Sequence, residues 1–226
     1  MRNGVYHHQT TNLNFLGIQL GIKIKFCGIT NSEDANYASD LGADALGFVF
    51  YSQSPRFVSL DKASKIIDKL PPFITSVGLF VNPTEAEVLD VINECRINLL
   101  QFHGDEDESF CTKFNLPYIK AIPMKPHVNL LKFCDDYSTA KALLLDTYST
   151  DLRGGTGKTF DWKLIPLNTS KPIIIAGGLN PQNIKNLLES IRPYGVDVSG
   201  GIESIKGKKD HQLMNEFITG VINAGV

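Results

Sequence analysis

The sequence predicts an α/β fold in which eight parallel strands, each followed by a helix, close into a single (β/α)8 barrel, the architecture of a TIM barrel. The chain has 226 residues, a length typical of one such barrel. From residue 22 on, short β-branched or apolar runs alternate with longer amphipathic stretches, the pattern of parallel strands joined by crossover helices. Eight such units can be counted, and open doubly wound sheets commonly have fewer strands.

Each expected strand is a short apolar or β-branched run. Several are apolar at successive positions, as in strands covered on both faces. The expected strands are Ile22–Cys27, Ala45–Phe50, Ile74–Val81, Leu99–His103, Tyr118–Ile122, Ala142–Asp146, Pro172–Ala176 and Val196–Ser199. No linker or low-complexity segment interrupts them, so we expect one barrel domain over residues 22–226, with residues 1–21 as an extension outside it.

Three helix starts carry a capping side chain or an early proline. They are Thr30 with Glu33, Asn82–Pro83 with Glu85, and Asn180–Pro181. The sixth unit is different, because a long loop over residues 147–159 precedes only a short helix near Phe160–Ile165. A long loop at that point indicates a functional role.

The charge pattern excludes several classes of partner. A formal net charge of −2 without a long run of one sign leaves no basic stripe for nucleic acid. Lys206, Lys208 and Lys209 form the nearest cluster, and we expect them in a solvated loop before the last helix. No apolar run approaches the roughly 18 residues that a membrane helix needs.

Cysteine usage indicates the compartment. The four cysteines have no CxxC spacing, and residues 1–21 lack the features of a secretory signal. We therefore expect free thiols and a cytoplasmic location. A monomer and a homodimer are both compatible with the sequence.

Two of the expected strands end in residues that could transfer protons. Cys27 ends the first strand just before a helix, whose N-terminal dipole could favour a thiolate. Asp146 ends the sixth strand, where a carboxyl group could keep a proton for general acid catalysis. The alternatives are a buried structural thiol for Cys27 and a capping carboxylate for Asp146.

Glycine pairs follow the last two strands, at Gly177–Gly178 and at Gly200–Gly201 after Ser199. Glycine lets backbone N–H groups approach an anion closely. Many barrels bind phosphate in the loops after strands seven and eight. The turns therefore predict a phosphate site, although tight turns alone are the alternative.

Two further side chains could line the mouth of the barrel. Arg56 lies in the loop after the second strand and could bind a carboxylate through two N–H groups, or simply face solvent. His103 ends the fourth strand and could line the pocket or cap the next helix.

The segment Gly154–Thr159 partly matches the sequence motif of a nucleotide-binding P-loop. Only three residues separate Gly154 from Lys158, although that motif requires Gly, four residues and then Gly-Lys. We therefore reject a nucleoside triphosphatase and expect a glycine-rich active-site loop.

Taken in order, these segments resemble the phosphoribosylanthranilate isomerase family over residues 22 to about 220. The segments that carry the resemblance are Lys25–Thr30, Ser54–Arg56, Gln101–Glu106, Leu145–Thr147, Gly154–Trp162 and the two glycine turns. Phe26 and Phe102 depart slightly, since smaller aliphatic residues are common there.

The resemblance implies an Amadori rearrangement in tryptophan biosynthesis without a metal or organic cofactor, on a small phosphorylated substrate. It implies that Asp146 protonates the furanose ring oxygen and that a Cys27 thiolate removes the C2 proton. The glycine turns with Ser199 would hold the phosphate, and Arg56 would take the anthranilate carboxylate.

Three alternatives differ in their residues. The related aminosugar isomerase of histidine biosynthesis has an aspartate at the first strand end, where this chain has Cys27. A metal-dependent pentose-phosphate epimerase would need His and Asp ligands at several strand ends, and only His103 is available. A noncatalytic phosphate-binding barrel would have no use for both Cys27 and Asp146.

Overall fold

The computed structural model describes residues 21–147, 159–166 and 168–224, and its centre is a closed barrel of parallel strands. Neighbouring strands pair in sequence order, and β8 closes the ring against β1. The strands are β1 Lys23–Cys27, β2 Ala45–Val49, β3 Thr75–Phe80, β4 Leu99–Phe102, β5 Tyr118–Met124, β6 Ala142–Thr147, β7 Ile173–Ile175 and β8 Gly195–Val198. The predicted fold class is confirmed, and each predicted strand overlaps an observed one.

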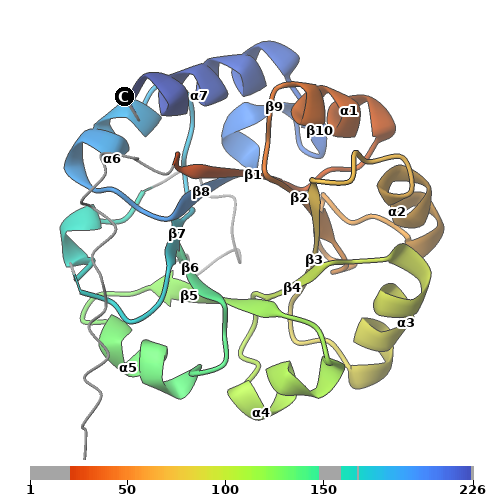
Figure 1. Cartoon of the computed structure of the whole chain (residues 1–226), viewed down its shortest axis with the longest axis horizontal. Coiled ribbons are helices and arrows are strands. Elements are labelled where there is room, and N and C mark those ends of the chain that lie inside the picture. Colours follow the sequence, from red (N-terminus) through yellow and green to blue (C-terminus); the bar gives the residue numbers. More distant parts are fainter. Residues whose placement is uncertain (1–20, 148–158, 167, 225–226) are drawn as a thin grey trace, which may run out of the picture.

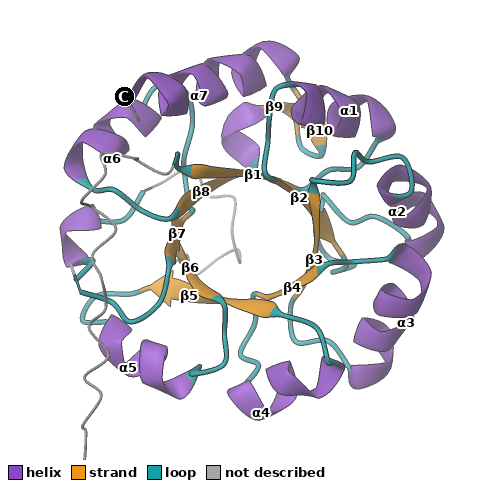
Figure 2. Ribbon diagram, viewed as in Figure 1, coloured by secondary structure: helices purple, strands orange, loops and turns teal. Residues whose placement is uncertain are grey.

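Helices form an outer ring around the strands (Figure 1, Figure 2). They are α1 Ser32–Asp40, α2 Leu60–Ile67, α3 Glu85–Cys95, α4 Glu108–Cys111, α5 Leu130–Asp136, α6 Ile184–Ser190 and α7 His211–Ala224. Short 3-10 helices are η2 Thr112–Phe114, η3 Trp162–Leu164 and η4 Gly200–Ile202, and a small hairpin joins β9 Glu203–Ile205 to β10 Lys208–Lys209. The described helices include none that is long and apolar enough to cross a membrane.

Alternation along each strand creates two apolar layers, because successive side chains of a strand point to opposite faces. Outward residues such as Phe26, Phe48 and Phe102 pack against the helices and are fully buried. A smaller cluster inside the barrel includes Ala121 and Leu144. The barrel is thus a packed core whose C-terminal rim remains for chemistry.

All three predicted helix caps are wrong by one to three residues. The N-cap of α6 is Asn183, not Asn180. The N-cap of α1 is Asn31, not Thr30, and its side chain accepts a hydrogen bond from the Asp34 amide. The N-cap of α3 is Thr84, which forms a capping box with Glu87. Such caps contribute about 0.5–2 kcal/mol each.

The described residues include Gly21 but not residues 1–20, so the extension outside the barrel stays a prediction. Of the loop expected over residues 147–159, residues 148–158 lie outside the described residues. The short helix expected after it is confirmed as η3.

Candidate active site

Cys27 ends β1 inside the mouth of the barrel, where it packs with Val49 and Leu79. The residue is 5 % exposed. Burial raises the pKa of the thiol above its ordinary value, and Lys25 opposes this rise with its positive charge. Desolvation thus outweighs the favourable charges in this state, and the expected effect of the helix start stays a prediction.

A buried lysine holds the backbone at this strand end. Lys209 Nζ donates to the carbonyl oxygens of Cys27 at 2.6 Å and Ser199 at 3.1 Å, and to Glu203 Oε1 at 3.0 Å. Burial lowers the pKa of Lys209 despite the charge of Glu203. The prediction of a solvated Lys209 is therefore wrong: β10 turns this side chain inward, while Lys206 and Lys208 are exposed.

Arg56 reaches over the mouth from the loop between β2 and α2. Its Nε and Nη2 atoms donate to the two carboxylate oxygens of Glu203, both at 2.7 Å. A Cβ at Gly200 would lie 3.0 Å from Nη2, so the guanidinium group borders the turn after β8. Because a guanidinium group carries five N–H donors, donors remain for a second anion.

Ionic interactions keep both groups of this pair charged. Burial lowers the pKa of Arg56, but hydrogen bonding and the charge of Glu203 bring it above its ordinary value. Burial would raise the pKa of Glu203, and its bonds to Arg56 and Lys209 bring it below the ordinary value instead. Sequence reasoning missed Glu203, which is 147 residues from Arg56 and has no local signal.

Asp146 is the second-last residue of β6 and is held by two contacts. Its Oδ1 atom accepts a hydrogen bond from the Thr147 amide at 2.8 Å, and its Oδ2 atom lies 2.9 Å from His103 Nε2. Gln101 Nε2 lies 3.1 Å from the other ring nitrogen of His103. The structure thus brings two predicted residues into direct contact and adds Gln101, whose Oε1 atom is buried without a hydrogen-bond partner among the described residues.

The glycine turn after β7 presents its backbone amides. Gly177 and Gly178 have φ values of 81° and 66°, which side-chain-bearing residues rarely adopt. The Gly178 carbonyl oxygen accepts hydrogen bonds from Asn180 and Asn183, which fixes the turn. The amides of Gly177 and Gly178 donate no hydrogen bond to any residue that the structure describes, so both remain available to an anion.

The turn after β8 packs directly on the turn after β7. A Cβ at Gly201 would overlap the carbonyl oxygen of Leu179, so glycine is required for this close approach. Ser199 donates its hydroxyl to the Cys27 carbonyl oxygen at 3.0 Å. The second glycine turn is therefore joined to the first turn on one side and to the end of β1 on the other.

These groups occupy one arc of the barrel mouth. β6, β7, β8, β1 and β2 are successive neighbours in the closed ring (Figure 1). Asp146 and Cys27 stand on β6 and β1, three strands apart on the shorter way round, and the two glycine turns lie between them. Arg56 follows β2 beyond Cys27, and His103 reaches Asp146 from β4, across β5.

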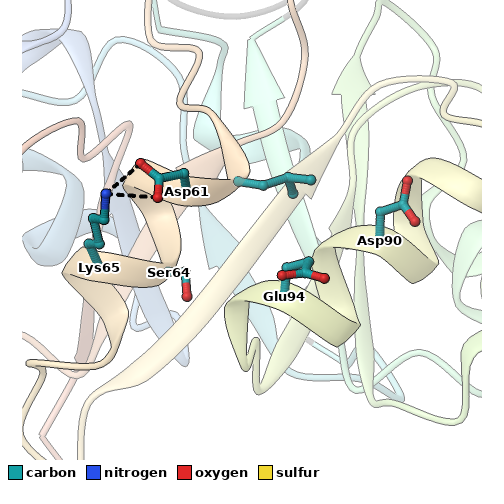
Figure 3. A pocket seen from close by; sticks show the side chains of 6 residues that line it. Asp61, Ser64, Lys65, Asp90 and Glu94 are labelled. Carbon is teal, nitrogen blue, oxygen red and sulfur yellow. Dashed lines mark hydrogen bonds and ion pairs between the residues drawn. The ribbon is translucent and has the colours of Figure 1, made fainter.

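A hollow on the outer surface is a different feature. It lies between α2 and α3 (Figure 3) and is lined by Leu60, Asp61, Ser64, Lys65, Asp90 and Glu94. Three of these residues are carboxylates, and the one cation, Lys65, pairs with Asp61 at 2.8 Å. Such a lining repels anions, and it includes none of the residues at the strand ends.

The remaining part of the predicted site is the glycine-rich segment 154–159, of which residues 154–158 lie outside the described residues. Within the described ranges, no group of three or more His, Cys, Asp or Glu residues is arranged to hold a metal ion.

Comparison with known proteins identifies relatives of nearly full length. The family model of N-(5'phosphoribosyl)anthranilate (PRA) isomerase matches residues 24–220. N-(5'-phosphoribosyl)anthranilate isomerase of Pseudomonas fluorescens (strain Pf0-1) is 50% identical over 200 residues, which are 88% of this chain and 98% of the relative.

Solved structures of the same name share the barrel. Phosphoribosyl anthranilate isomerase from Thermotoga maritima is 38% identical with a TM-score of 0.82, over 89% of this chain and 99% of that chain. A complex of phosphoribosyl anthranilate isomerase with reduced 1-(o-carboxyphenylamino)-1-deoxyribulose 5-phosphate is 36% identical with a TM-score of 0.80, over the same shares. By family match, identity and fold, this chain belongs to the phosphoribosylanthranilate isomerase family.

Proposed function

We propose that the chain converts N-(5-phospho-β-D-ribosyl)anthranilate to 1-(2-carboxyphenylamino)-1-deoxy-D-ribulose 5-phosphate, an Amadori rearrangement in tryptophan biosynthesis. The observation that carries this proposal is the arc of the mouth on which Asp146, two glycine turns and Cys27 follow one another. An acid and a base on either side of a phosphate site are what the isomerisation of a phosphorylated aminosugar requires. A relative 36% identical to this chain binds the reduced product.

The acid step is assigned to Asp146. Its protonated carboxyl group would give a proton to the furanose ring oxygen, and the C1–O bond would then break to leave an iminium ion. His103, 2.9 Å from Oδ2, would orient the carboxyl group toward the sugar. The positive charge of the iminium ion makes the C2 proton more acidic, which prepares the second step.

The base step is assigned to Cys27. Its thiolate would take the C2 proton, and the electrons of the C–H bond would neutralise the iminium ion to give an enolamine. Tautomerisation then gives the ketone. Because burial raises the pKa of Cys27, the thiolate is the minor form of this thiol at neutral pH.

The two anionic groups of the substrate would bind at the glycine turns and at Arg56. The phosphate would accept hydrogen bonds from the amides of Gly177, Gly178 and Gly200–Gly201, with Ser199 at the junction. The anthranilate carboxylate would accept from the donors of Arg56 that Glu203 leaves unused. This arrangement would suspend the ribose between the acid and the base.

The phosphate assignment predicts the effect of Gly178→Val. The valine side chain would block the approach of an anion to the amides. A hydrogen bond to a charged group contributes about 1.5–3 kcal/mol, so its loss should weaken substrate binding by about 10- to 100-fold. Gly42→Val is the matched control, because Gly42 also has a positive φ, of 91°, and has no atoms around it that a Cβ would meet. Calorimetric titration with inorganic phosphate measures the effect.

Both variants should lose stability, since a left-handed backbone costs a non-glycine residue about 1–2 kcal/mol. Only Gly178→Val should lose phosphate affinity, and equal affinity in the two variants would contradict the assignment. Gly201→Val is a poorer probe, because its Cβ would collide with the backbone of Leu179 and displace both turns.

Turnover of the anthranilate substrate tests the function as a whole. The purified chain should convert it without added metal or cofactor, and chromatography that separates the two isomers measures the product. The corresponding aminosugar substrate of histidine biosynthesis serves as the comparison. Turnover of that compound alone would refute the proposal.

A cytoplasmic location completes the proposal. All four cysteines, Cys27, Cys95, Cys111 and Cys134, lie within the described residues and are free and buried, which fits a reducing compartment. The small phosphorylated substrate is the one partner that the proposed reaction needs, and a monomer or homodimer stays a prediction.

A further inference from the structure

Three lysines are buried in the described part of the chain, and one of them differs from the others in its partners. Lys120 and Lys209 each donate to three oxygen atoms, two carbonyl and one carboxylate. Lys25, which is 5 % exposed, has a single oxygen partner among the described residues, Asp197 Oδ1 at 2.9 Å. Since an ammonium group carries three donors, the oxygen partners of Lys25 do not satisfy it.

The strand register directs Lys25 toward the thiol of Cys27. The two residues are two positions apart in β1, so their side chains lie on the same, inner side of the barrel. Asp197 is the direct partner of Lys25 on β8. A Cβ at Gly47, on the other neighbouring strand, would lie 2.9 Å from Cys27 Sγ and 3.0 Å from Lys25 Nζ. Glycine at position 47 therefore leaves one small space that the thiol and the ammonium group both border.

We propose that Lys25, held in place by Asp197, is a positioning residue whose ammonium group stabilises the thiolate of Cys27 during proton removal. This inference rests on the proposed role of Cys27 as the base. A thiolate inside an apolar barrel is costly unless a cation accompanies it. Lys25 precedes Cys27 by two residues in β1 and supplies that cation from inside the barrel. The side of the sulfur that faces the barrel mouth therefore stays open to the substrate.

The charged groups around Cys27 support this assignment. Burial raises the pKa of the thiol, and among its charged neighbours Lys25 has the largest opposing effect, followed by Lys209. Asp197 acts in the other direction. Burial lowers the pKa of Lys25, but Asp197 and then Cys27 bring it above its ordinary value, so the ammonium form persists in the barrel.

Two other groups face the same strand end but are occupied elsewhere. Lys209 is engaged by two carbonyl oxygens and Glu203, and Arg56 is paired with Glu203. Glu203 thus neutralises much of their charge. Lys25 and Asp197 are left as the pair whose removal should move the titration of Cys27 in opposite directions.

The experiment compares Lys25→Met with Asp197→Asn. The rate at which iodoacetamide alkylates Cys27 is measured against pH, with the modified peptide quantified by mass spectrometry. Lys25→Met should move the midpoint upward by about 1–3 pH units, the usual effect of losing an adjacent opposite charge. Asp197→Asn should move it downward, because an anion next to the sulfur is lost while the cation remains. Lys25→Arg should restore most of the midpoint by keeping the charge.

A purely structural role would lower the melting temperature in both variants and leave the midpoint of alkylation unchanged, and that result would overturn the proposal. Lys120→Met is the matched control, because Lys120 is equally buried and paired with Glu106 but lies on β5. If Lys25→Met fails to fold, the double variant Lys25→Met with Asp197→Asn avoids an unpaired buried carboxylate. A folded double variant whose midpoint equals that of Asp197→Asn would equally overturn the proposal, because Lys25 would then have no effect of its own.

The readout separates this inference from the proposed function. Alkylation reports the charge state of Cys27 whether or not the thiol takes part in turnover. If Cys27→Ser keeps full activity while Lys25→Met still shifts the midpoint, the assignment of the base fails and the Lys25–Cys27 interaction stands.

Discussion

Cys27→Ser should lower turnover at saturating substrate by about 10²- to 10⁴-fold, the usual contribution of a general base. A serine hydroxyl fills nearly the same space between Val49 and Leu79, so the fold should persist. It is a far weaker acid than a thiol and supplies almost no anion near neutral pH. Steady-state kinetics, together with binding of the reduced product, measures the two effects separately.

Binding of the reduced product should survive in Cys27→Ser, because the glycine turns and Arg56 are unchanged. Cys134→Ser is the matched control, since Cys134 is a buried thiol on α5, on the outer layer of the barrel. It should lose stability without losing turnover. Near-normal turnover in Cys27→Ser would remove this residue from the mechanism.

Asp146→Asn should also cost about 10²- to 10⁴-fold in turnover, through loss of the proton that opens the ring. The amide oxygen can still accept the bond from the Thr147 amide that Asp146 accepts at 2.8 Å. The change therefore removes the acid with little disturbance of the strand end. Rapid-quench measurement of ring opening in a single turnover would show whether this step is the one that slows.

Asp44→Asn provides the comparison for Asp146→Asn. Asp44 also accepts a backbone hydrogen bond, from the Ile24 amide at 2.8 Å, but it precedes β2 at the opposite end of the barrel. Its replacement should lower the melting temperature and leave kcat unchanged. If Asp44→Asn and Asp146→Asn lowered kcat equally, the loss would reflect stability, and the acid would have to be sought elsewhere.

The sequence allowed the strands to be predicted because their apolar runs are local signals. Helix caps were less predictable, because a capping residue can be used for another contact. Asparagine is a residue type that often caps helices. Asn82, however, has a φ of 48°, and its side chain accepts a hydrogen bond from the Asp105 amide in the loop after β4. Thr84 is then left to cap α3.

Charged partners inside the barrel were not predictable, because they join residues far apart in the chain. Lys25 and Asp197 are separated by 172 positions, and His103 and Asp146 by 43. The strand-end rule placed His103 and Asp146 on the same rim. It could not show that the imidazole spans β5 to reach the carboxylate, since that depends on side-chain direction.

The bidentate pair of Arg56 and Glu203 has a consequence for the entropy of binding. A free arginine has many rotamers, and ordering such a side chain on association costs about 0.5–1.5 kcal/mol. Glu203 already fixes the guanidinium plane of Arg56 through two hydrogen bonds, each 2.7 Å long. On the proposed binding mode, the conformational entropy of this side chain is lost when the chain folds, and the incoming carboxylate meets a preorganised receptor.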